Sequence, residues 1–262
     1  MEKHYCLDDS PTFRMIELDE VDSTNTFLRH MEAKDDRRTV LVTAEHQTAG
    51  RGSGTNRWES ERGQNLLLSL RLMPKALPAH RMFAISEAAA LAVADALEAF
   101  APGFLVKWPN DVYHGDHKVA GTLIENDLTG SRVARSTVGI GININQRLFR
   151  SDAPNPRSLA QIAGHDIERR FVLEQFVQQM MHRMQAIDGG LLDALHDEYL
   201  SRLYLRGQQH AFADKDGTFR ATLTDVEPTG HLILTDTDGG RRRYDFKEVR
   251  FCLSTEAERT AG

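Results

Sequence analysis

Hydrophobic residues in the first quarter of the chain come in short runs, which is the pattern of β-strands. Residues 13–21 alternate between apolar and polar, and residues 39–45 and 65–72 are nearly continuous apolar runs that predict buried strands. Asp22-Ser23-Thr24-Asn25 lies after the first run and is a cluster of side chains that cap helix N-termini. We therefore expect a short helix from this cluster through about Met31.

The middle of the chain contains longer segments with apolar residues three and four positions apart, and these predict helices. Helices are expected over about 79–100, 171–187 and 191–202. Strands are expected over 104–113, 118–125 and 136–145. Pro109 breaks the first of these strands, and we interpret the first two as a hairpin whose polar tip carries Lys107, Asn110, Asp111 and Lys118.

Beyond Leu205 the apolar runs become shorter and are separated by turns rich in glycine, which predicts antiparallel strands. Such strands are expected over 219–226, 231–236 and 241–246. The chain as a whole reads as an α+β protein with two parts. We place the larger domain at residues 1–204 and a small β domain at residues 205–262.

The stretch from Gln47 to Trp58 contains three glycines in five residues, with Arg51 and Arg57 at its two ends. Glycines allow backbone N–H groups to point into one concavity that holds an anion, and arginine adds a planar fork of donors. A tryptophan face can stack on a base, a contact of roughly 1–3 kcal/mol. The loop therefore predicts a nucleotide-like ligand, although a solvated connection has the same composition. It is not a P-loop, because no Gly-Lys-Ser/Thr follows.

The overall charge limits the possible partners. The chain has 32 basic and 38 acidic residues, a net charge of −6, which argues against broad binding to a nucleic acid. Cys6 and Cys252 are the only cysteines, and they lack metal-ligand spacing, so we expect a reducing cytoplasmic setting and no structural metal site. The N-terminus has no apolar segment of a secretory signal, and no segment is apolar enough to cross a membrane.

The most specific motif is Lys107-Trp-Pro-Asn-Asp111 followed by Lys118-Val-Ala-Gly121. With these residues the sequence resembles the catalytic part of the biotin–protein ligases. The rest of the match is in family order and consists of Ser23-Thr24-Asn25, Gln47 to Gly52, Trp58, Asn65-Leu66 and Gly139 to Asn143. The resemblance covers about residues 21–145.

The resemblance implies a fold and a reaction. The fold would be a central mixed sheet flanked by helices, like that of class II aminoacyl-tRNA synthetases and lipoate ligases, with a C-terminal barrel of SH3 type. The reaction would join biotin to ATP as biotinyl-5'-AMP and transfer the biotinyl group to a lysine of a biotin carboxyl carrier domain. Mg²⁺ would arrive with ATP and lie near Asn110 and Asp111, and no tightly bound prosthetic group is expected.

The resemblance also implies roles for individual residues. The catalytic residues would be Arg51, Lys118 and Asp111. Biotin would contact Ser23, Thr24, Asn25, Gln47, Gly50, Arg51, Gly52, Ser53, Lys118 and Gly121. ATP or the adenylate would contact Arg51, Arg57, Trp58, Asn110, Lys118 and Asn143.

Neighbouring positions have less specific roles. Gly121, Gly139 and Gly141 would let the ligand lie against the backbone. Leu66 and Leu68 are expected either in the pocket wall or in the core. Asp111, from its position on the hairpin, would accept the proton of the incoming lysine, whose pKa is ordinarily about 10.4.

Two features depart from the family pattern. Ser53 and Asn56 stand where family members often carry basic residues, so we expect a mobile glycine loop without ligand and escape of the adenylate. About twenty residues precede Ser23, too few for the winged-helix DNA-binding domain of some members, so we expect no operator binding.

Two other readings remain open at this point. Lipoate–protein ligases share the fold and the adenylate chemistry, but their Arg-Arg-x-Ser-Gly-Gly-Gly signature is absent. A non-catalytic nucleic-acid module would use the glycine loop and the run Arg241-Arg242-Arg243, which is otherwise a solvated strand edge. Neither the acceptor protein nor the oligomeric state is indicated.

Overall fold

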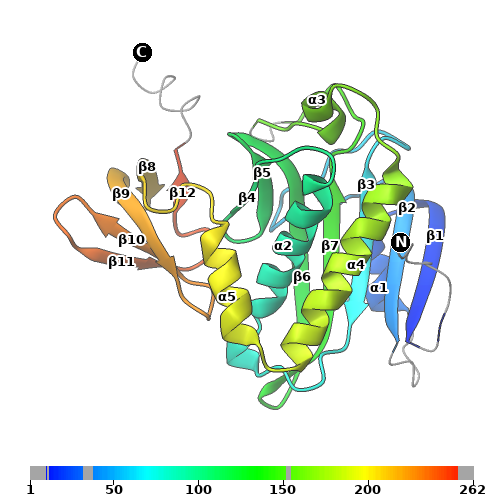
Figure 1. The fold of residues 1–262 in the computed structure, drawn as a ribbon, viewed down its shortest axis with the longest axis horizontal. Helices are drawn as coiled ribbons and strands as arrows, with labels where there is room; N and C mark the ends of the chain where they lie inside the picture. The colour runs from blue at the N-terminus through cyan, green and yellow to red at the C-terminus, as the bar shows by residue number, and fades with distance from the viewer. Residues whose placement is uncertain (1–9, 11, 32–37, 152–154, 253–262) are drawn as a thin grey trace.

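A seven-stranded mixed sheet forms the centre of the protein in a computed structural model, which describes residues 10, 12–31, 38–151 and 155–252 (Figure 1). Its strand order is β1-β2-β3-β7-β6-β5-β4, and β1 and β2 are parallel while all other neighbours are antiparallel. The strands are β1 (Phe13–Val21), β2 (Thr39–Gln47), β3 (Leu66–Leu72), β4 (Phe104–Lys107), β5 (Asp111–His114), β6 (His117–Thr129) and β7 (Arg132–Ile142). The expected central mixed sheet is therefore present. Cys6 lies outside the described residues.

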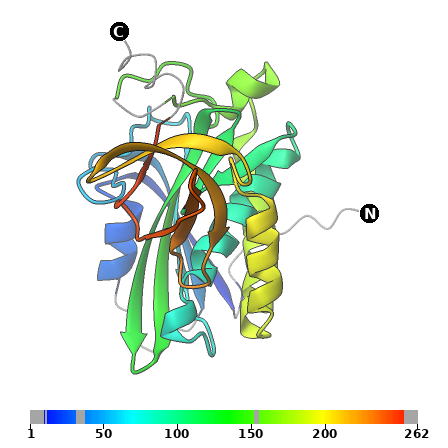
Figure 2. The same ribbon diagram turned by 90° about the vertical axis from the view of Figure 1, so that its left-hand side faces the viewer.

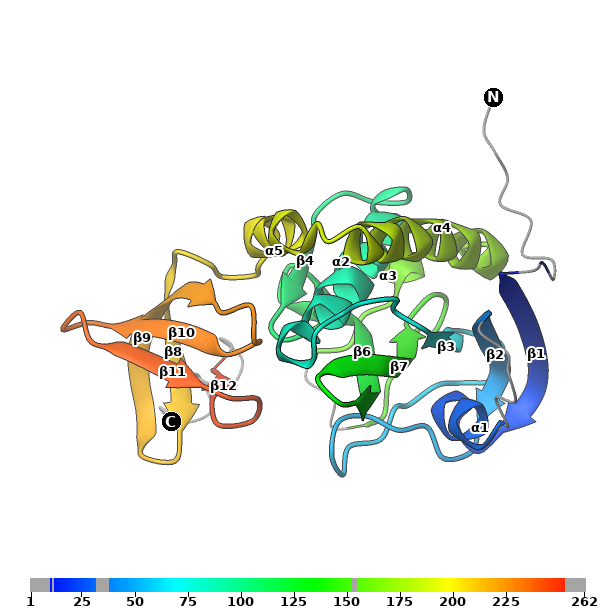
Figure 3. The same ribbon diagram turned by 90° about the horizontal axis from the view of Figure 1, so that it is seen from below.

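The two faces of this sheet carry different helices, as Figure 3 shows. The elements on one face are the 3-10 turn η1 (Ala79–Arg81) and the helices α2 (Ala84–Glu98), α4 (Arg169–Asp188) and α5 (Leu192–Ser201). The short helix α1 (Thr24–His30) lies on the opposite face. Helix α3 (Leu159–Ala163) follows the central sheet in the chain and is closed at its N-terminus by a capping box of Ser158 and Gln161.

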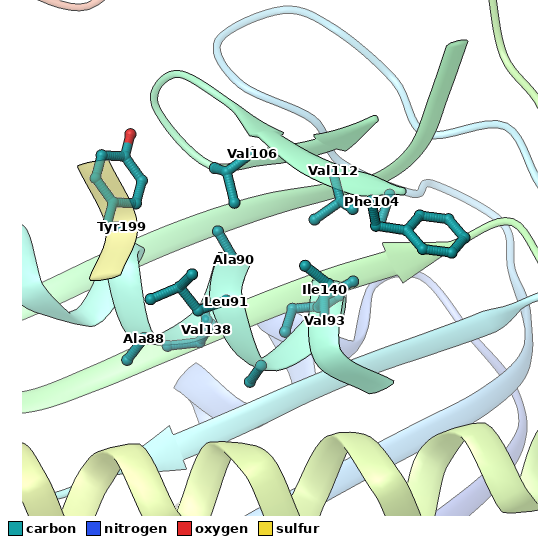
Figure 4. Close-up of a cluster of buried hydrophobic side chains, with 14 of the residues drawn as sticks. Ala88, Ala90, Leu91, Val93, Phe104, Val106, Val112, Val138, Ile140 and Tyr199 are labelled. Atoms are coloured by element: carbon teal, nitrogen blue, oxygen red, sulfur yellow. The ribbon is translucent and has the colours of Figure 1, made fainter. Parts of the chain in front are cut away.

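Helix α2 packs closely on the sheet because seven of its 15 residues are alanine, whose small side chain lets the backbones approach. Figure 4 shows Ala90 and Val93 of α2 against Val138 and Ile140 of β7. All four side chains are almost fully buried. This cluster makes the helix face of the sheet a rigid support for whatever binds to the other face.

Successive side chains of a strand point to opposite faces, and β7 uses this alternation sharply. Val138 and Ile140 face the helices, while Gly139 and Gly141 between and beyond them face α1 and the glycine loop. The glycines in this strand therefore open one face only. The other face keeps its core.

The hairpin predicted over residues 104–125 is present in β5 and β6, which are antiparallel and joined by the turn between His114 and His117. Its polar tip is wrong. Pro109 lies in a separate turn between the antiparallel strands β4 and β5, where Lys107 pairs with Asp111. The predicted polar residues therefore do not share one tip, because Asp111 begins β5 at the end opposite the β5–β6 turn.

A second sheet follows α5 and is antiparallel throughout, with the order β11-β10-β9-β8-β12. Its strands are β8 (Gln209–Asp214), β9 (Gly217–Val226), β10 (Leu232–Asp236), β11 (Arg241–Tyr244) and β12 (Arg250–Phe251). Figure 2 views the protein from the side of this second sheet, which lies in front of the central sheet. The antiparallel prediction is confirmed, while the SH3-type barrel, the synthetase likeness and the boundary at residue 204 stay predictions.

Buried ionic contacts tie the helices together and lead toward the second sheet. His196 Nδ1 on α5 lies 2.6 Å from Glu87 Oε1 on α2, and both side chains are nearly inaccessible. The hydrogen bond to Glu87 raises the pKa of His196, and desolvation by burial raises the pKa of Glu87. Asp225 of β9 and Arg81 of η1 also act on this pair.

Across the described residues, none of the helices combines the length and apolar character that crossing a bilayer requires.

Candidate active site

One cavity of about 730 Å³ lies where α1, the glycine loop, β6 and β7 meet the second sheet. Almost every predicted site residue lines it. These are Ser23, Thr24, Asn25, Gln47, Arg51, Gly52, Ser53, Arg57, Trp58, Asn110, Asp111, Lys118, Gly121 and Asn143. Gly50 and Leu66 do not line it, whereas Leu68 does. The volume is that of a pocket for a small ligand of drug or cofactor size.

The glycine loop is itself a small hairpin. Arg51 and Arg57 form a β-bridge, and the N–H of Gly52 donates to the carbonyl of Asn56 at 2.8 Å. The N–H of Trp58 donates to the carbonyl of Gly50 at 3.1 Å. A Cβ on Gly50 would lie 2.8 Å from the Trp58 carbonyl oxygen, so the hairpin itself requires a glycine at this position. The contact of Gly50 with biotin stays a prediction.

Trp58 lies with its indole on bare backbone. Gly121 and Gly141 are partners across β6 and β7, and a Cβ on either would meet the indole, at 3.0 Å from Cζ3 and 2.6 Å from Cζ2 respectively. We expected these glycines to open space for the ligand. In the structure Trp58 fills that space, because a flat ring packs well where two facing residues lack side chains.

Asn25 fills the space over Gly139 in the same way, since a Cβ there would lie 2.7 Å from Asn25 Cγ. Its amide is held firmly: Oδ1 is 2.6 Å from Ser69 Oγ, and Nδ2 donates to the carbonyl of Leu123 at 3.3 Å and to Glu125 at 3.2 Å. Asn25 is 3% exposed, so these bonds fix its position.

Thr24 continues this polar network toward Gln47. Thr24 Oγ1 lies 2.7 Å from Ser69 Oγ and donates to Gln47 Oε1 at 3.0 Å, and the Thr24 N–H donates to the same oxygen at 2.7 Å. Ser23 occupies the N-cap position of α1, but its hydroxyl makes no capping hydrogen bond. The network places several donors and acceptors along one side of the cavity.

Arg51 is paired with a carboxylate. Its NH1 and NH2 donate to Glu125 Oε2 at 3.3 Å and Oε1 at 3.2 Å, a two-point contact. Arg29 of α1 reaches the same carboxylate at 3.1 Å. Glu125 thus receives contacts from Arg51, Arg29 and Asn25, and joins the glycine loop to α1.

Lys118 is paired as well. Its Nζ lies 2.6 Å from Asp111 Oδ2 and 5.8 Å from the centre of the Trp58 ring. Arg51 and Lys118 therefore share the cavity beside Trp58, the arrangement required if both act on one ligand. Lys107 lies elsewhere, over the rings of Tyr113 and Phe251 and away from the cavity lining.

Three cavity-lining residues have a buried polar atom without a hydrogen-bond partner among the described residues: Asn126 Oδ1 and, in two residues predicted to contact ATP, Trp58 Nε1 and Asn143 Oδ1. Asn143 is 3% exposed, and its Nδ2 donates weakly to the carbonyl of Arg157 at 3.4 Å. Buried polar atoms are usually paired, so an acceptor and a donor from a ligand fit Trp58 Nε1 and Asn143 Oδ1.

The second sheet supplies a wall of the cavity that the sequence did not indicate. Thr229, Gly230, Asp245 and Phe246 line the cavity from its turns. Trp108 Nε1 donates to the carbonyl of Gly230 at 2.9 Å and fixes one of these turns against the β4–β5 turn. Ser69 and Glu125 were also missed as network members, although the position of Glu125 seven residues after Lys118 was a visible signal.

Comparison with known proteins identifies the family to which the chain belongs. The model of the Biotin/lipoate A/B protein ligase family matches residues 18–143. The biotin–[acetyl-CoA-carboxylase] ligase of Paracoccus denitrificans is 30% identical over 226 residues, which are 81% of this chain and 90% of that protein. The bifunctional ligase/repressor of Bacillus subtilis is 30% identical over 215 residues, 78% of this chain and 64% of that protein.

Solved structures of biotin protein ligases have the same fold as this chain. A biotin protein ligase from Aquifex aeolicus in complex with biotin and ATP has a TM-score of 0.75 to this chain at 26% identity, covering 91% of this chain and 99% of that one. Fold and cavity together define a ligase of the Biotin/lipoate A/B class. Within that class the chain belongs to the biotin protein ligases. The predicted enzyme class is confirmed, and the lipoate alternative is not supported.

Proposed function

We propose that the cavity binds biotin and Mg-ATP together and catalyses both half-reactions at one place. In the first, a biotin carboxylate oxygen bonds to the α-phosphorus, and pyrophosphate leaves with the electrons of the broken P–O bond. In the second, a lysine amine of a carrier domain bonds to the acyl carbon, AMP leaves, and the amine gives up a proton. The observation that supports this best is that Arg51 and Lys118 face one cavity beside Trp58.

The first half-reaction brings two anions together, so positive charge must lie between them. Arg51 and Lys118 supply it once they exchange Glu125 and Asp111 for the ligand. The N–H groups of the glycine loop add fixed dipoles on the same side. The unpaired Asn143 Oδ1 suits the exocyclic amine of adenine, and the Trp58 indole suits its face.

The ureido ring of biotin needs a few fixed hydrogen bonds within an otherwise apolar contact. The network of Thr24, Asn25 and Gln47 provides such groups, and Ser23 has its hydroxyl free of the capping bond. Gly52, Ser53 and Gly121 lie next to these groups on the cavity wall and would approach the same ligand.

The second half-reaction needs a base, because the acceptor amine ordinarily has a pKa near 10.4 and attacks only when neutral. Asp111 lines the cavity and would take that proton after Lys118 has turned to the phosphate. The oxygens of Asp111 and Asn110 are hard donors of the kind that Mg²⁺ prefers, so they fit the ion that accompanies ATP.

The partner of this reaction is proposed to be a biotin carboxyl carrier domain, and the proposed compartment is the cytoplasm. The relative from Paracoccus denitrificans is named for acetyl-CoA carboxylase, which supports the first point. The low cysteine content supports the second.

The direct test is to mix the protein with biotin, ATP radiolabelled at the α-phosphate and Mg²⁺, and to separate the products. We expect labelled biotinyl-adenylate without an acceptor, and labelled AMP together with a biotinylated carrier domain when one is added. Lipoate in place of biotin is the matched control and should give no adenylate above background. Equal turnover of both acids, or none with biotin, would contradict the proposal.

A further inference from the structure

We propose that Lys247, in the turn before β12, seats the glycine loop and retains the adenylate from the side of the second sheet; this inference rests on the proposed function. Lys247 belongs to the turn that follows β11, which also carries the cavity residues Asp245 and Phe246. It acts as a positioning residue, because it touches the loop and not the reacting atoms.

The first observation is the contact itself. The ammonium nitrogen of Lys247 lies so close to Gly54 that a Cβ on that glycine would overlap it. Gly54 is at the tip of the loop hairpin, between Ser53 and Asn56, which both line the cavity. A side chain from the second sheet therefore reaches the glycine loop, which lies outside the central sheet.

The second observation is the backbone of Lys247. Its φ is +72°, in the left-handed region that glycine adopts without cost. For a long side chain this conformation is uncommon, and such outliers are concentrated at ligand sites and switch regions. With its backbone in this conformation, the Lys247 side chain reaches Gly54.

The third observation is the charge balance around the cavity. Arg51 and Lys118 are each paired with a carboxylate, Glu125 and Asp111. Lys247 forms no ion pair with any residue that the structure describes, and its ammonium nitrogen lies 5.8 Å from the centre of the Phe246 ring. Its charge is therefore uncommitted, in a chain with a net charge of −6.

These observations fit one role. Ser53 and Asn56 give the loop two neutral residues beside Gly54. The ammonium of Lys247 supplies positive charge at that point and holds the loop against the second sheet. An anion enclosed by the loop is then retained by a residue that lies about 190 positions further along the chain.

The test measures how fast biotinyl-adenylate leaves the enzyme, by rapid filtration of the preformed complex with radiolabelled adenylate. Lys247→Met removes the charge and keeps the stem; Lys247→Gly removes both and also relieves the strained φ. We expect the dissociation rate to rise about tenfold in each, the size of one lost charge-assisted contact. Lys247→Arg should remain near the wild-type rate. Lys215→Met, in an exposed turn of the same sheet, is the matched control and should not change it.

Two further readouts separate this role from a merely structural one. Lys247→Gly should unfold at the same or a higher urea concentration than wild type, because glycine is unstrained there, while still losing adenylate faster. Salt should speed dissociation from wild type more than from Lys247→Met, because only wild type has the ammonium to screen.

Wild-type dissociation rates in both Lys247→Met and Lys247→Gly would overturn the inference, as would an equal effect in Lys215→Met. A change confined to the KM for the carrier domain would also overturn it and would assign Lys247 to acceptor recognition. If wild-type protein forms no biotinyl-adenylate at all, it is the proposed function that fails.

Discussion

Gly139 and Gly141 lie two residues apart on the same face of β7. The absent side chain leaves room for Asn25 at Gly139 and for Trp58 at Gly141. A methyl group on Gly139 would lie 2.7 Å from Asn25 Cγ, and one on Gly141 would lie 2.6 Å from Trp58 Cζ2. Distances under 3.0 Å require something to move. The pair Gly139→Ala and Gly141→Ala therefore tests the proposed biotin and nucleotide ends of the cavity separately.

In Gly139→Ala the new methyl group would meet Asn25, which cannot move without losing hydrogen bonds. Asn25 is buried and hydrogen-bonded to Ser69, to the Leu123 carbonyl and to Glu125. Overpacking costs about 1–3 kcal/mol, and stranding one buried polar group costs about 1–3 kcal/mol. Alanine regains about 0.4–1 kcal/mol by restricting the unfolded chain. We expect unfolding free energy to fall by about 2–4 kcal/mol in urea titrations, and the Kd for biotin to rise at least about tenfold by calorimetry.

In Gly141→Ala the new methyl group would meet Trp58, which can move because it belongs to the loop hairpin. We expect a loss of less than about 1 kcal/mol of stability, an unchanged Kd for biotin and faster release of the adenylate. A double-mutant cycle adds a control: in an Asn25→Ala background, Gly139→Ala should cost little, because the colliding amide is gone. The reasoning is refuted if Gly139→Ala binds biotin normally, or if Gly141→Ala is the variant that loses biotin.

Three further expectations follow from named contacts. Asp111→Asn should form biotinyl-adenylate at nearly the wild-type rate but transfer it at least about tenfold more slowly; single-turnover assays that show equal losses in both steps would exclude Asp111 as the base. Ser53→Arg should slow adenylate escape, measured by the same filtration assay, and unchanged escape would mean that charge at this position is immaterial. The hydrogen bond to Glu87 raises the pKa of His196, so the imidazole binds its proton more tightly in the folded chain. Its contribution to stability is therefore present below the ordinary histidine pKa of about 6.5 and is lost as pH rises through the raised pKa. Urea titrations from pH 6 to pH 9 should give this fall, and the double variant Glu87→Gln/His196→Gln should flatten it.

Local patterns sufficed to predict most elements of the fold. The alternating run at 13–21 became β1, and the nearly continuous apolar runs at 39–45 and 65–72 became the buried strands β2 and β3. Strands β8 and β12 were missed. Strand β8 (Gln209–Asp214) is only partly buried, and β12 has two residues, so neither leaves a periodic signal.

Residue lists from the motifs predicted the cavity lining well, but not what each residue touches. Trp58 lying on Gly121 and Gly141 depends on strand register, and the contact of Lys247 with Gly54 depends on how the second sheet sits beside the first. Both are contacts between segments far apart in sequence. No local spacing contains them. The misplaced polar tip has a different cause, because residues 104–113 were read as one strand and the turn between β4 and β5 was missed.

Arg51 and Lys118 are each paired with a carboxylate in the cavity, and this makes the site selective before any chemistry occurs. Glu125 and Asp111 are carried by the strands β6 and β5, so each competes for its cation at the effective concentration of a tethered group, in the millimolar range or above. An inorganic phosphate or acetate ion at lower concentration does not displace Glu125 or Asp111 from these cations. An acid whose hydrocarbon part also contacts the cavity can displace the carboxylates. The ligand-free protein therefore selects among anions by the apolar group that each anion carries.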